Sequence, residues 1–446
     1  MPAPLWVQYK VEIRVRQQPH TTDRVEGTLK KESRIGASRA ISPVPMPVSS
    51  IPARVRDLIA RLAQDAGFAA AGIAQVPAPG SPEDEQERSR FSAWIDHGRA
   101  GSMEYLKCRD DQGRLLRSSV RVALPWARSV IVCAANYGAQ PIPRSVDPAP
   151  PGAAWIARYA ITQQPSSGQP DPANPAETRP SDYHKILLRR LQALRDQLAT
   201  HVGPFESRCF VDTGPVVERV YARYAGLGWI GKNTCLISQS LGSWLFLGVI
   251  VTSLELPSDP PAAETANRST CAPLAALPPD RCGSCTRCID VCPTQALTPY
   301  QMDATRCIAY LTIEHRGTIP EDLRPGIGRQ VFGCDICQDV CPWNQRTSSA
   351  PGVPHPDPQL ALRTDLINPA LDWLAAMDEA EYGRRFNGSP VRRAKFSGFR
   401  RNLAIAIGNS GLRRCLPTLD HWATDTDPVL ADAAQWAVDH LRRKLE

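Results

Sequence analysis

The chain has 446 residues, a mass of 48.9 kDa and a formal net charge of +7, with 42% hydrophobic and 22% charged residues. This length predicts two or three packed domains, and the composition is that of a soluble globular protein. No apolar run approaches the roughly 18 residues of a membrane span, and no secretory signal is visible at the start. We therefore expect a cytoplasmic protein with no membrane association, and the positive charge mildly favours an anionic partner.

The predicted elements begin after residues 1–49, which we interpret as a disordered extension that ends in a Ser/Pro-rich run. Alternating helices and strands then predict an α/β domain over residues 50–260. Its apolar strand at 244–252 is expected to be central. We interpret the Pro-rich stretch at about 138–181 as an inserted surface loop. The other expected strands lie at 68–74, 129–135 and 208–212, and the expected helices at 52–67, 85–97, 183–198 and 216–225.

A cysteine-rich domain is predicted at residues 272–345, where eight of the 14 cysteines lie. In a reducing compartment such a cluster indicates metal ligation before disulfides. The run Cys282-x2-Cys285-x2-Cys288-x3-Cys292-Pro matches the bacterial ferredoxin motif, whose first three thiolates bind one [4Fe–4S] cluster and whose fourth binds the other. Two clusters imply one-electron transfers, so the residues before them must supply a second reactive site.

The second run, Cys334-x2-Cys337-x3-Cys341-Pro, has Val331 where the motif places its first cysteine, and Cys307 is the unassigned cysteine nearby. Zinc is the main alternative, but it has no use for the Cys-x3-Cys-Pro crossover. The motif therefore predicts two ligand sets: Cys282, Cys285, Cys288 and Cys341 for one cluster, and Cys292, Cys307, Cys334 and Cys337 for the other.

Several segments resemble the epoxyqueuosine reductase family. They include Asp212-Thr213-Gly214-Pro215, Gly231-Lys232-Asn233 and Cys334-Asp335-Ile336-Cys337. The resemblance implies a nitroreductase-like α/β domain that binds cobalamin, a ferredoxin-like domain with two [4Fe–4S] clusters, and C-terminal α-helical HEAT-like repeats at 365–446. It also implies that the enzyme reduces epoxyqueuosine to queuosine in the wobble position of tRNA, which is the last step of queuosine biosynthesis.

The chemistry agrees with this resemblance, because reducing an epoxide consumes two electrons and protons, whereas clusters deliver electrons singly. We expect an external low-potential donor to supply the electrons and Co(I)-cobalamin to attack the substrate. Asp212 is expected to protonate the departing oxygen, with a pKa raised by burial. It ends a predicted strand before a helix, where open α/β sheets place their sites. The alternative is a helix N-cap.

Four further residues are expected to bind the cofactor. Gly231, Lys232 and Asn233 lie in a turn and are expected to contact the amide-rich rim of the corrin. Tyr105 matches a family segment near the cofactor. The alternatives are a turn glycine kept for its backbone freedom, a solvated lysine and a partly buried tyrosine.

A basic segment between Arg384 and Arg401 contains seven basic residues, no acidic residue and three interleaved phenylalanines. Cations neutralise phosphates and aromatic rings stack on unpaired bases, so the segment is expected to bind the tRNA anticodon loop. The alternative is a solvated basic face. The predicted tRNA-binding residues are Arg316, Arg392, Arg393, Lys395, Arg400 and Arg401.

Two other functions compete with this interpretation. A cobalamin-dependent reductive dehalogenase would share the fold and clusters but act on a small organohalide. A non-catalytic electron-transfer module would leave Asp212 and the basic segment without a role. A monomer is the default expectation for this protein.

Overall fold

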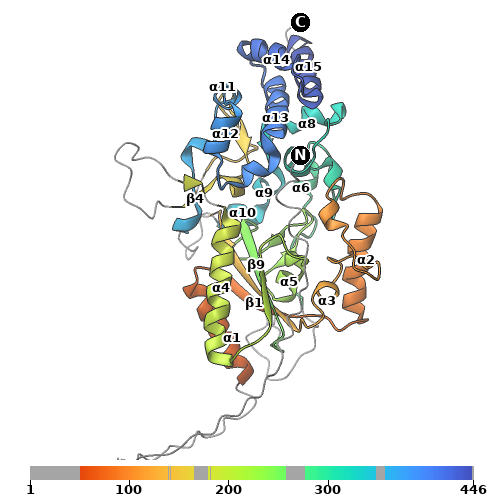
Figure 1. Ribbon diagram of the computed structural model, residues 1–446, viewed down its shortest axis with the longest axis vertical. Coiled ribbons are helices and arrows are strands. Elements are labelled where there is room, and N and C mark those ends of the chain that lie inside the picture. The colour runs from red at the N-terminus through yellow and green to blue at the C-terminus, as the bar shows by residue number, and fades with distance from the viewer. Residues whose placement is uncertain are drawn as a thin grey trace, which may run out of the picture. The chain divides into compact units, whose positions relative to one another are not determined.

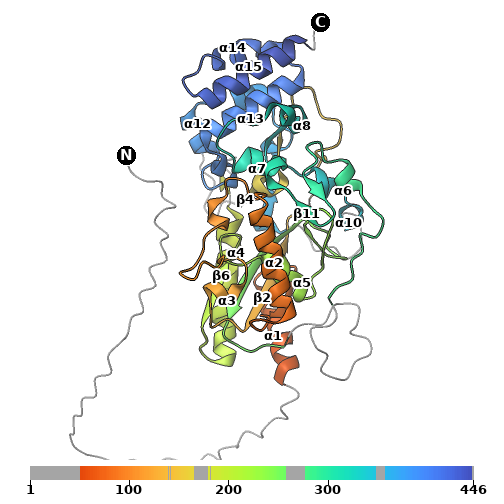
Figure 2. The same ribbon diagram turned by 90° about the vertical axis from the view of Figure 1, so that its right-hand side faces the viewer.

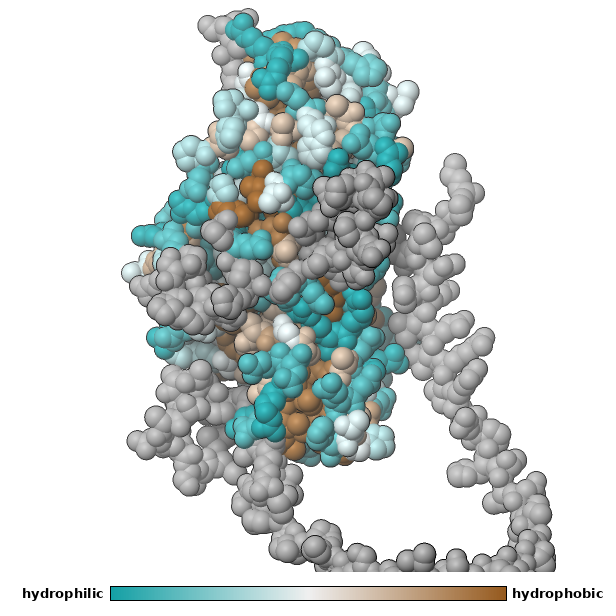
Figure 3. Space-filling model, turned by 90° about the vertical axis from the view of Figure 1, so that its left-hand side faces the viewer, coloured by the Kyte–Doolittle hydropathy of each residue, from teal (hydrophilic) through white to brown (hydrophobic). Residues whose placement is uncertain are grey.

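The computed structural model describes residues 51–138, 140, 142–164, 179–180, 182–257, 277–347 and 357–443. The predicted disordered extension at 1–49 and residues 165–178 of the Pro-rich stretch lie outside the described residues. In the part of the chain that is described, no helix has both the length and the apolar character needed to cross a bilayer. The face shown in Figure 3 mixes hydrophilic and apolar residues, as folded protein surfaces generally do.

A four-stranded sheet lies at the centre of the first domain (Figure 1). The strands in spatial order are β1 (Ala70–Gln75), β2 (Ser129–Asn136), β9 (Leu245–Thr252) and β6 (Ser207–Phe210). β2 and β9 are buried along almost their whole length, because both are continuous apolar runs that pack on two faces. The expected central position of the 244–252 strand is confirmed.

Every neighbouring pair of strands in this sheet is antiparallel. Helices and strands alternate along the chain as expected, but neighbouring strands are antiparallel, so the rule that places sites at the carboxyl ends of a parallel sheet does not apply. The expectation that Asp212 is the last residue of its strand is wrong. Asp212 instead lies two residues beyond Phe210, where β6 ends, in the connection to the next helix.

Helices cover both faces of the sheet (Figures 1 and 2). α1 (Ile51–Asp65) and α4 (Tyr183–Val202) pack their apolar sides on one face, and α5 (Glu218–Tyr224) packs on the other. α4 begins where the Asp182 side chain accepts a hydrogen bond from the backbone N–H of His184 at 3.0 Å. Two further helices precede β2, namely α2 (Pro82–Asp96) and α3 (Val120–Ala123).

Residues 277–347 consist of short elements that carry the eight clustered cysteines, in agreement with a ferredoxin-like domain. Cys285 precedes α6 and Cys288 lies in it, just as Cys334 precedes α9 and Cys337 lies in it, and these two helices pack on each other. The elements in order are α6 (Arg287–Asp290), β10 (Leu297–Thr298), β11 (Gln301–Met302), α7 (Ile308–Ile313), α8 (Arg324–Ile327), β12 (Gln330–Phe332), α9 (Ile336–Asp339) and α10 (Pro342–Thr347).

Part of the Pro-rich stretch is not a surface loop. β3 (Trp155–Ile156) pairs in parallel with β12 of the cysteine domain, and both of its residues are buried. The indole Nε1 of Trp155 and the backbone N–H of Arg158 donate to Asp335 Oδ2 at 3.0 and 2.7 Å. The surface-loop interpretation is therefore wrong for residues 153–162, which join the first domain to the cysteine domain. β4 (Thr162–Gln164) then pairs with β5 (Arg179–Pro180) and β13 (Ala361–Leu362).

The C-terminal region is helical, as predicted. α13 (Lys395–Ser410) packs on α15 (Pro428–Arg443), and Gly408 allows close approach because a Cβ there would lie 2.8 Å from Ala437 Cβ. These helices share one apolar core with α7 and β12, so the cysteine domain and the helical region form one packed unit. The remaining helices of this region are α11 (Leu371–Ala375), α12 (Glu379–Arg385) and α14 (Leu416–Trp422).

Candidate functional site

Asp212 stands in a strained and accessible position. Its φ of 56° is uncommon for a residue with a side chain, and the side chain is 51% exposed, so the expected burial of this acid is wrong. Its carboxylate accepts a hydrogen bond from the Tyr183 hydroxyl and lies 3.6 Å from His184 Nε2. Arg117 donates to the Asp212 backbone carbonyl at 3.2 Å. An accessible acid held by three neighbours fits a proton-transfer role better than a helix N-cap, and α5 begins only at Glu218.

Tyr183 and His184 are functional candidates that the sequence analysis did not assign. The Tyr183 ring stacks between His184 and Phe246, with both pairs of ring centroids 4.0 Å apart. His184 Nδ1 lies 2.7 Å from Asp182 Oδ1, which orients the imidazole toward Asp212. Burial, followed by the charge of Asp212, raises the pKa of Tyr183 well above its ordinary value, so its hydroxyl keeps its proton. Both residues lie in Asp182-Tyr183-His184, a segment that also resembles the family. This resemblance was the signal in the sequence that could have identified them.

Tyr105, a predicted cofactor residue, lies between two arginines. The guanidinium of Arg117 is 5.8 Å from the centre of its ring, and that of Arg393 is 5.5 Å away. Arg393 also forms an ion pair with Glu314. Because Arg117 reaches Asp212, a continuous line of contacts runs from the candidate acid through Tyr105 to the basic segment of the helical region.

Cysteines that the motif assigns to the same set lie near one another in the structure. In the first set, Cys288 interacts electrostatically with its three expected partners, Cys282, Cys285 and Cys341. In the second set, Cys334 interacts with Cys292 and Cys307, and Cys337 with Cys307 and Cys334. Among the described residues, no three His, Cys, Asp or Glu side chains converge as the ligands of one metal ion do.

The surroundings of these cysteines suit an iron–sulfur cluster. The backbone N–H of Ala296 donates to Cys292 Sγ at 3.4 Å, and those of Trp343 and Asn344 donate to Cys341. Such donors stabilise thiolates and help to set cluster potentials. Burial raises the pKa of the Cys288 thiol to about 11, so its ligation depends on the positive charge of bound iron.

Lys232 makes a different contact from the one predicted. Its Nζ donates to the carbonyl oxygens of Gly283 at 2.6 Å and Cys285 at 3.1 Å, both in the loop of the first cysteine set. Its backbone N–H donates to Cys282. Lys232 therefore holds that loop, a contact that its sequence segment did not predict. Sequence spacing could not show this, because the loop lies some 50 residues further along the chain.

The turn that contains Gly231 and Asn233 connects α5, which follows Asp212 in the chain, to the second cysteine set. A Cβ at Gly231 would lie 2.4 Å from Ile237 Cδ1 and 2.9 Å from Asn233 Oδ1, so a larger residue there would displace these side chains. Asn233 is buried, and its Nδ2 has no hydrogen-bond partner among the described residues. Arg219, in α5, donates to Thr234 of this turn. At the other end, the thiol of Cys235 is hydrogen-bonded to Cys337 of the second cysteine set.

Three of the predicted tRNA-binding residues lie at the border between the cysteine domain and the helical region. Arg392 and Lys395 are exposed, and Arg393 is exposed although it pairs with Glu314. Arg316 donates to the carbonyl oxygens of Ile313, Arg393 and Ala394 at 2.9, 2.7 and 3.2 Å. Arg316 therefore anchors the basic segment to the end of α7, which leaves it less available to a ligand than Arg392.

Arg401 does not face solvent, and its predicted contact with tRNA is wrong. Its side chain is 1% exposed and donates to the carbonyl oxygens of Leu311, His315 and Gly317 at 2.6, 3.0 and 2.8 Å. Burial lowers its pKa to about 10. Arg401 lies on the side of α13 that packs on the cysteine domain. The run of basic residues in the sequence could not predict this placement. Arg400 is also less available to a ligand, because its guanidinium forms an ion pair with Asp425 at 3.0 Å.

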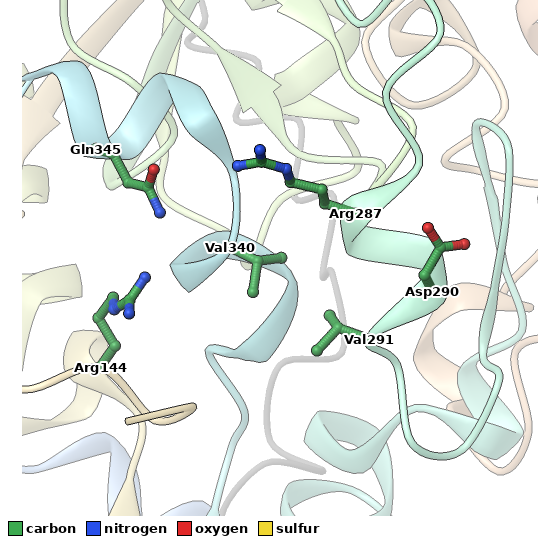
Figure 4. A pocket seen from close by; sticks show the side chains of 6 residues that line it. All are labelled: Arg144, Arg287, Asp290, Val291, Val340 and Gln345. Atoms are coloured by element: carbon green, nitrogen blue, oxygen red, sulfur yellow. The ribbon is translucent and has the colours of Figure 1, made fainter. Parts of the chain in front are cut away.

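A cavity of about 450 Å³ opens beside the loops of the first cysteine set (Figure 4). Figure 4 shows Arg287 extending over Val340 toward Gln345, with Arg144 facing them from the neighbouring segment. None of the residues that line this cavity belongs to the group around Asp212. The lining residues are Arg144, Arg287, Asp290, Val291, Val340 and Gln345.

The structure combines two sets of four cysteine thiolates with the candidate acid Asp212, and the turn that contains Gly231 and Asn233 reaches the second set. This combination defines an iron–sulfur oxidoreductase. Residues 281–344 match the family model described as a 4Fe-4S double cluster binding domain. Residues 117–213, which include Asp212, match the model described as epoxyqueuosine reductase QueG, DUF1730. The match over 281–344 supports two [4Fe–4S] clusters in this protein.

The comparisons with individual proteins agree. The epoxyqueuosine reductase of Xanthomonas campestris pv. campestris is 39% identical over 386 residues, which cover 85% of this chain and 94% of that protein. The one of Pseudomonas aeruginosa is 36% identical over 360 residues, covering 80% and 86%. A crystal structure of epoxyqueuosine reductase with an epoxyqueuosine-modified tRNA-Tyr stem loop has a TM-score of 0.68 at 24% identity, covering 87% of this chain and 90% of that one. The chain belongs to the epoxyqueuosine reductase family.

Proposed function

We propose that this protein reduces epoxyqueuosine to queuosine in the wobble position of tRNA. One observation carries the proposal beyond family membership. The contacts of Arg117 and Arg393 with Tyr105 link the accessible acid Asp212 to the exposed basic segment, which supports the proposal. A nucleic-acid substrate held by its phosphates at Arg392 and Arg393 could therefore present one splayed base toward Asp212. A small organohalide would leave the basic segment without a role, and so would a protein that only transfers electrons.

The residues around the turn fit cobalamin. The buried Nδ2 of Asn233 lacks a hydrogen-bond partner within the described chain, and the corrin rim offers amide oxygens that accept such a bond. Asn233 and Gly231 would hold the rim, and Tyr105 would border the substrate side. When bound, cobalamin would supply a two-electron reductant from electrons that arrive singly. Asp212 would hold the proton that the departing oxygen takes, and Tyr183 and His184 would orient that carboxyl.

The difference in burial between the loops of the two cysteine sets favours one direction of electron flow. The loop around Cys285 is exposed at Gly283, Thr286 and Arg287, whereas Gly333 and Asp335, which flank Cys334, are buried. The second set also contacts Cys235 in the turn that reaches α5. An external low-potential donor would therefore reduce the first cluster, and the second would pass electrons toward the site. A tRNA substrate places this proposed reaction in the cytoplasm.

An anoxic turnover assay tests the proposed function. The protein with both clusters reconstituted would be incubated with cobalamin, a low-potential reductant and tRNA that carries epoxyqueuosine. We expect nucleoside mass spectrometry to show a product lighter by one oxygen atom, formed only when cobalamin is present. Intact clusters and bound cobalamin without such a product would contradict the proposal, and an organohalide would be the next substrate to assay.

The double variant Arg392→Ala/Arg393→Ala is expected to weaken tRNA binding and to reduce its salt dependence. The plot of log K against log salt has a negative slope, and its magnitude becomes smaller by roughly 0.7 to 0.9 for each phosphate that a protein no longer neutralises. We expect the magnitude to decrease by about 1, because Arg393 already pairs with Glu314 and contributes less than a free cation. Binding would be measured by fluorescence anisotropy over a range of salt concentrations. The matched control is Arg189→Ala/Arg195→Ala on α4, and equal slopes in both double variants would show that the basic segment is only a solvated face.

A further inference from the structure

The proposed reaction consumes more protons than Asp212 alone can hold. Removing an epoxide oxygen as water breaks two C–O bonds, forms a C=C bond and consumes two electrons and two protons. The external donor supplies the electrons through the clusters. Asp212 supplies one proton, so a second proton must reach the same oxygen. This inference rests on the proposed function and asks which group of the chain supplies that second proton.

Glu218 is a buried acid close to Asp212 in the chain. It is the first residue of α5, six residues after Asp212 across a single connection, and it is 9% exposed. Its Oε1 has no hydrogen-bond partner in the part of the chain that the structure describes. An ionised carboxylate in such a place carries a large desolvation cost, and holding a proton removes that cost. An acid serving only the helix terminus would be expected at the surface, where it stays charged.

The charges that face Glu218 also favour its protonated form. Burial, and then the negative charge of Asp212, raises the pKa of Glu218 to about 7, against the lowering effects of its own backbone N–H, Arg117 and Arg219. The strands packed on α5 present apolar residues to that helix, such as Ala74, Val130 and Val249. Below about pH 7 the group therefore holds a proton, and above that pH it loses it.

We propose that Glu218 is the second proton store of the site and returns a proton to Asp212 after Asp212 has given up its own. In the first transfer, the O–H bond of Asp212 breaks and a substrate O–H bond forms as the first C–O bond opens. The O–H bond of Glu218 then breaks and Asp212 regains its proton. Asp212 passes this proton to the same oxygen, which leaves as water when the second C–O bond breaks. Solvent re-protonates Glu218 between turnovers.

The pH profile of turnover tests this role. Wild-type turnover with saturating reductant is expected to fall as the pH rises above about 7. Glu218→Gln, which keeps the size of the side chain but cannot release a proton in this range, is expected to be about 10- to 100-fold slower and to lose that pH dependence. Glu218→Asp restores an acid and should restore the dependence in part. The matched control Glu85→Gln, an exposed residue of α2, should behave as wild type.

A second measurement does not depend on turnover. Infrared difference spectra of the protein without cobalamin should show a protonated carboxyl band that disappears as the pH rises through about 7. The band should be absent in Glu218→Gln and present in Glu85→Gln. Wild-type rates and pH profile in Glu218→Gln, or an unchanged band in that variant, would overturn the inference. A wild-type protein that forms no queuosine would overturn the proposed function, and this role with it.

Discussion

Replacing Asp212 by Asn is expected to lower turnover of epoxyqueuosine-containing tRNA by about 10²- to 10⁴-fold, the range typical of losing a general acid. The amide keeps the size of the carboxyl and can still meet the Tyr183 hydroxyl, so the loop should keep its path. It cannot release a proton to the departing oxygen. Single-turnover rates with pre-reduced protein would measure this loss separately from electron delivery.

Three quantities should stay unchanged in the Asp212→Asn variant: iron content, bound cobalamin and tRNA affinity. The matched control is Asp196→Asn, an exposed carboxylate on α4 that pairs only with its neighbour Arg195 among the described residues. A variant that reacts within a few-fold of wild type would remove Asp212 from the mechanism. A variant that loses cobalamin or iron would assign Asp212 a structural role instead.

The spacing of the cysteines carried the prediction of two [4Fe–4S] clusters, which the family model over residues 281–344 supports. A cluster needs thiolates at a fixed geometry, and three of them on one tight loop can do this only at certain separations, so Cys282, Cys285 and Cys288 could be assigned from spacing alone. The central strand at 244–252 was equally predictable, because a continuous apolar run must be covered on both faces.

Properties that depend on tertiary packing could not be predicted in the same way. Arg401 and Arg392 belong to one run of basic residues, yet Arg401 meets three backbone carbonyls in the core while Arg392 faces solvent. Trp155 lies in a Pro-rich stretch but donates to Asp335, 180 residues later in the chain. In both cases the partner is remote in sequence, and nothing local to the residue indicates it.

The site around Asp212 shows the same limit on a smaller scale. The acid itself was predicted from its family-like segment, but its contacts come from separate parts of the chain. Tyr183 and His184 begin α4, and Arg117 precedes α3. Glu218 carries no motif that distinguishes a buried proton store from an ordinary acid at a helix start. A proton store is distinguished from an ordinary acid here by the burial of Glu218 and by its Oε1, which has no hydrogen-bond partner among the described residues. These two properties arise from the fold.

The crossover between the two cysteine runs leads to the other large expected effect. Cys341 lies with Cys282 and Cys288, although its neighbours in sequence are Cys334 and Cys337 of the other set. Cys341→Ala should therefore impair the cluster on Cys282, Cys285 and Cys288 and leave the other intact. Cys307→Ala should do the reverse. Each variant should lose up to about half of the iron and nearly all turnover, because electrons must pass both clusters in series.

Electron paramagnetic resonance and iron analysis of the reduced proteins would separate these two variants. Each should retain one cluster signal, and the two retained signals should differ, because the loops around the two sets differ in exposure and the cysteines differ in their hydrogen bonds. Cys108→Ala, at an exposed cysteine outside both sets, is the control and should keep both signals. If Cys341→Ala and Cys307→Ala lost the same signal, the two residues would ligate one cluster. The exchange of ligands between the runs would then be wrong.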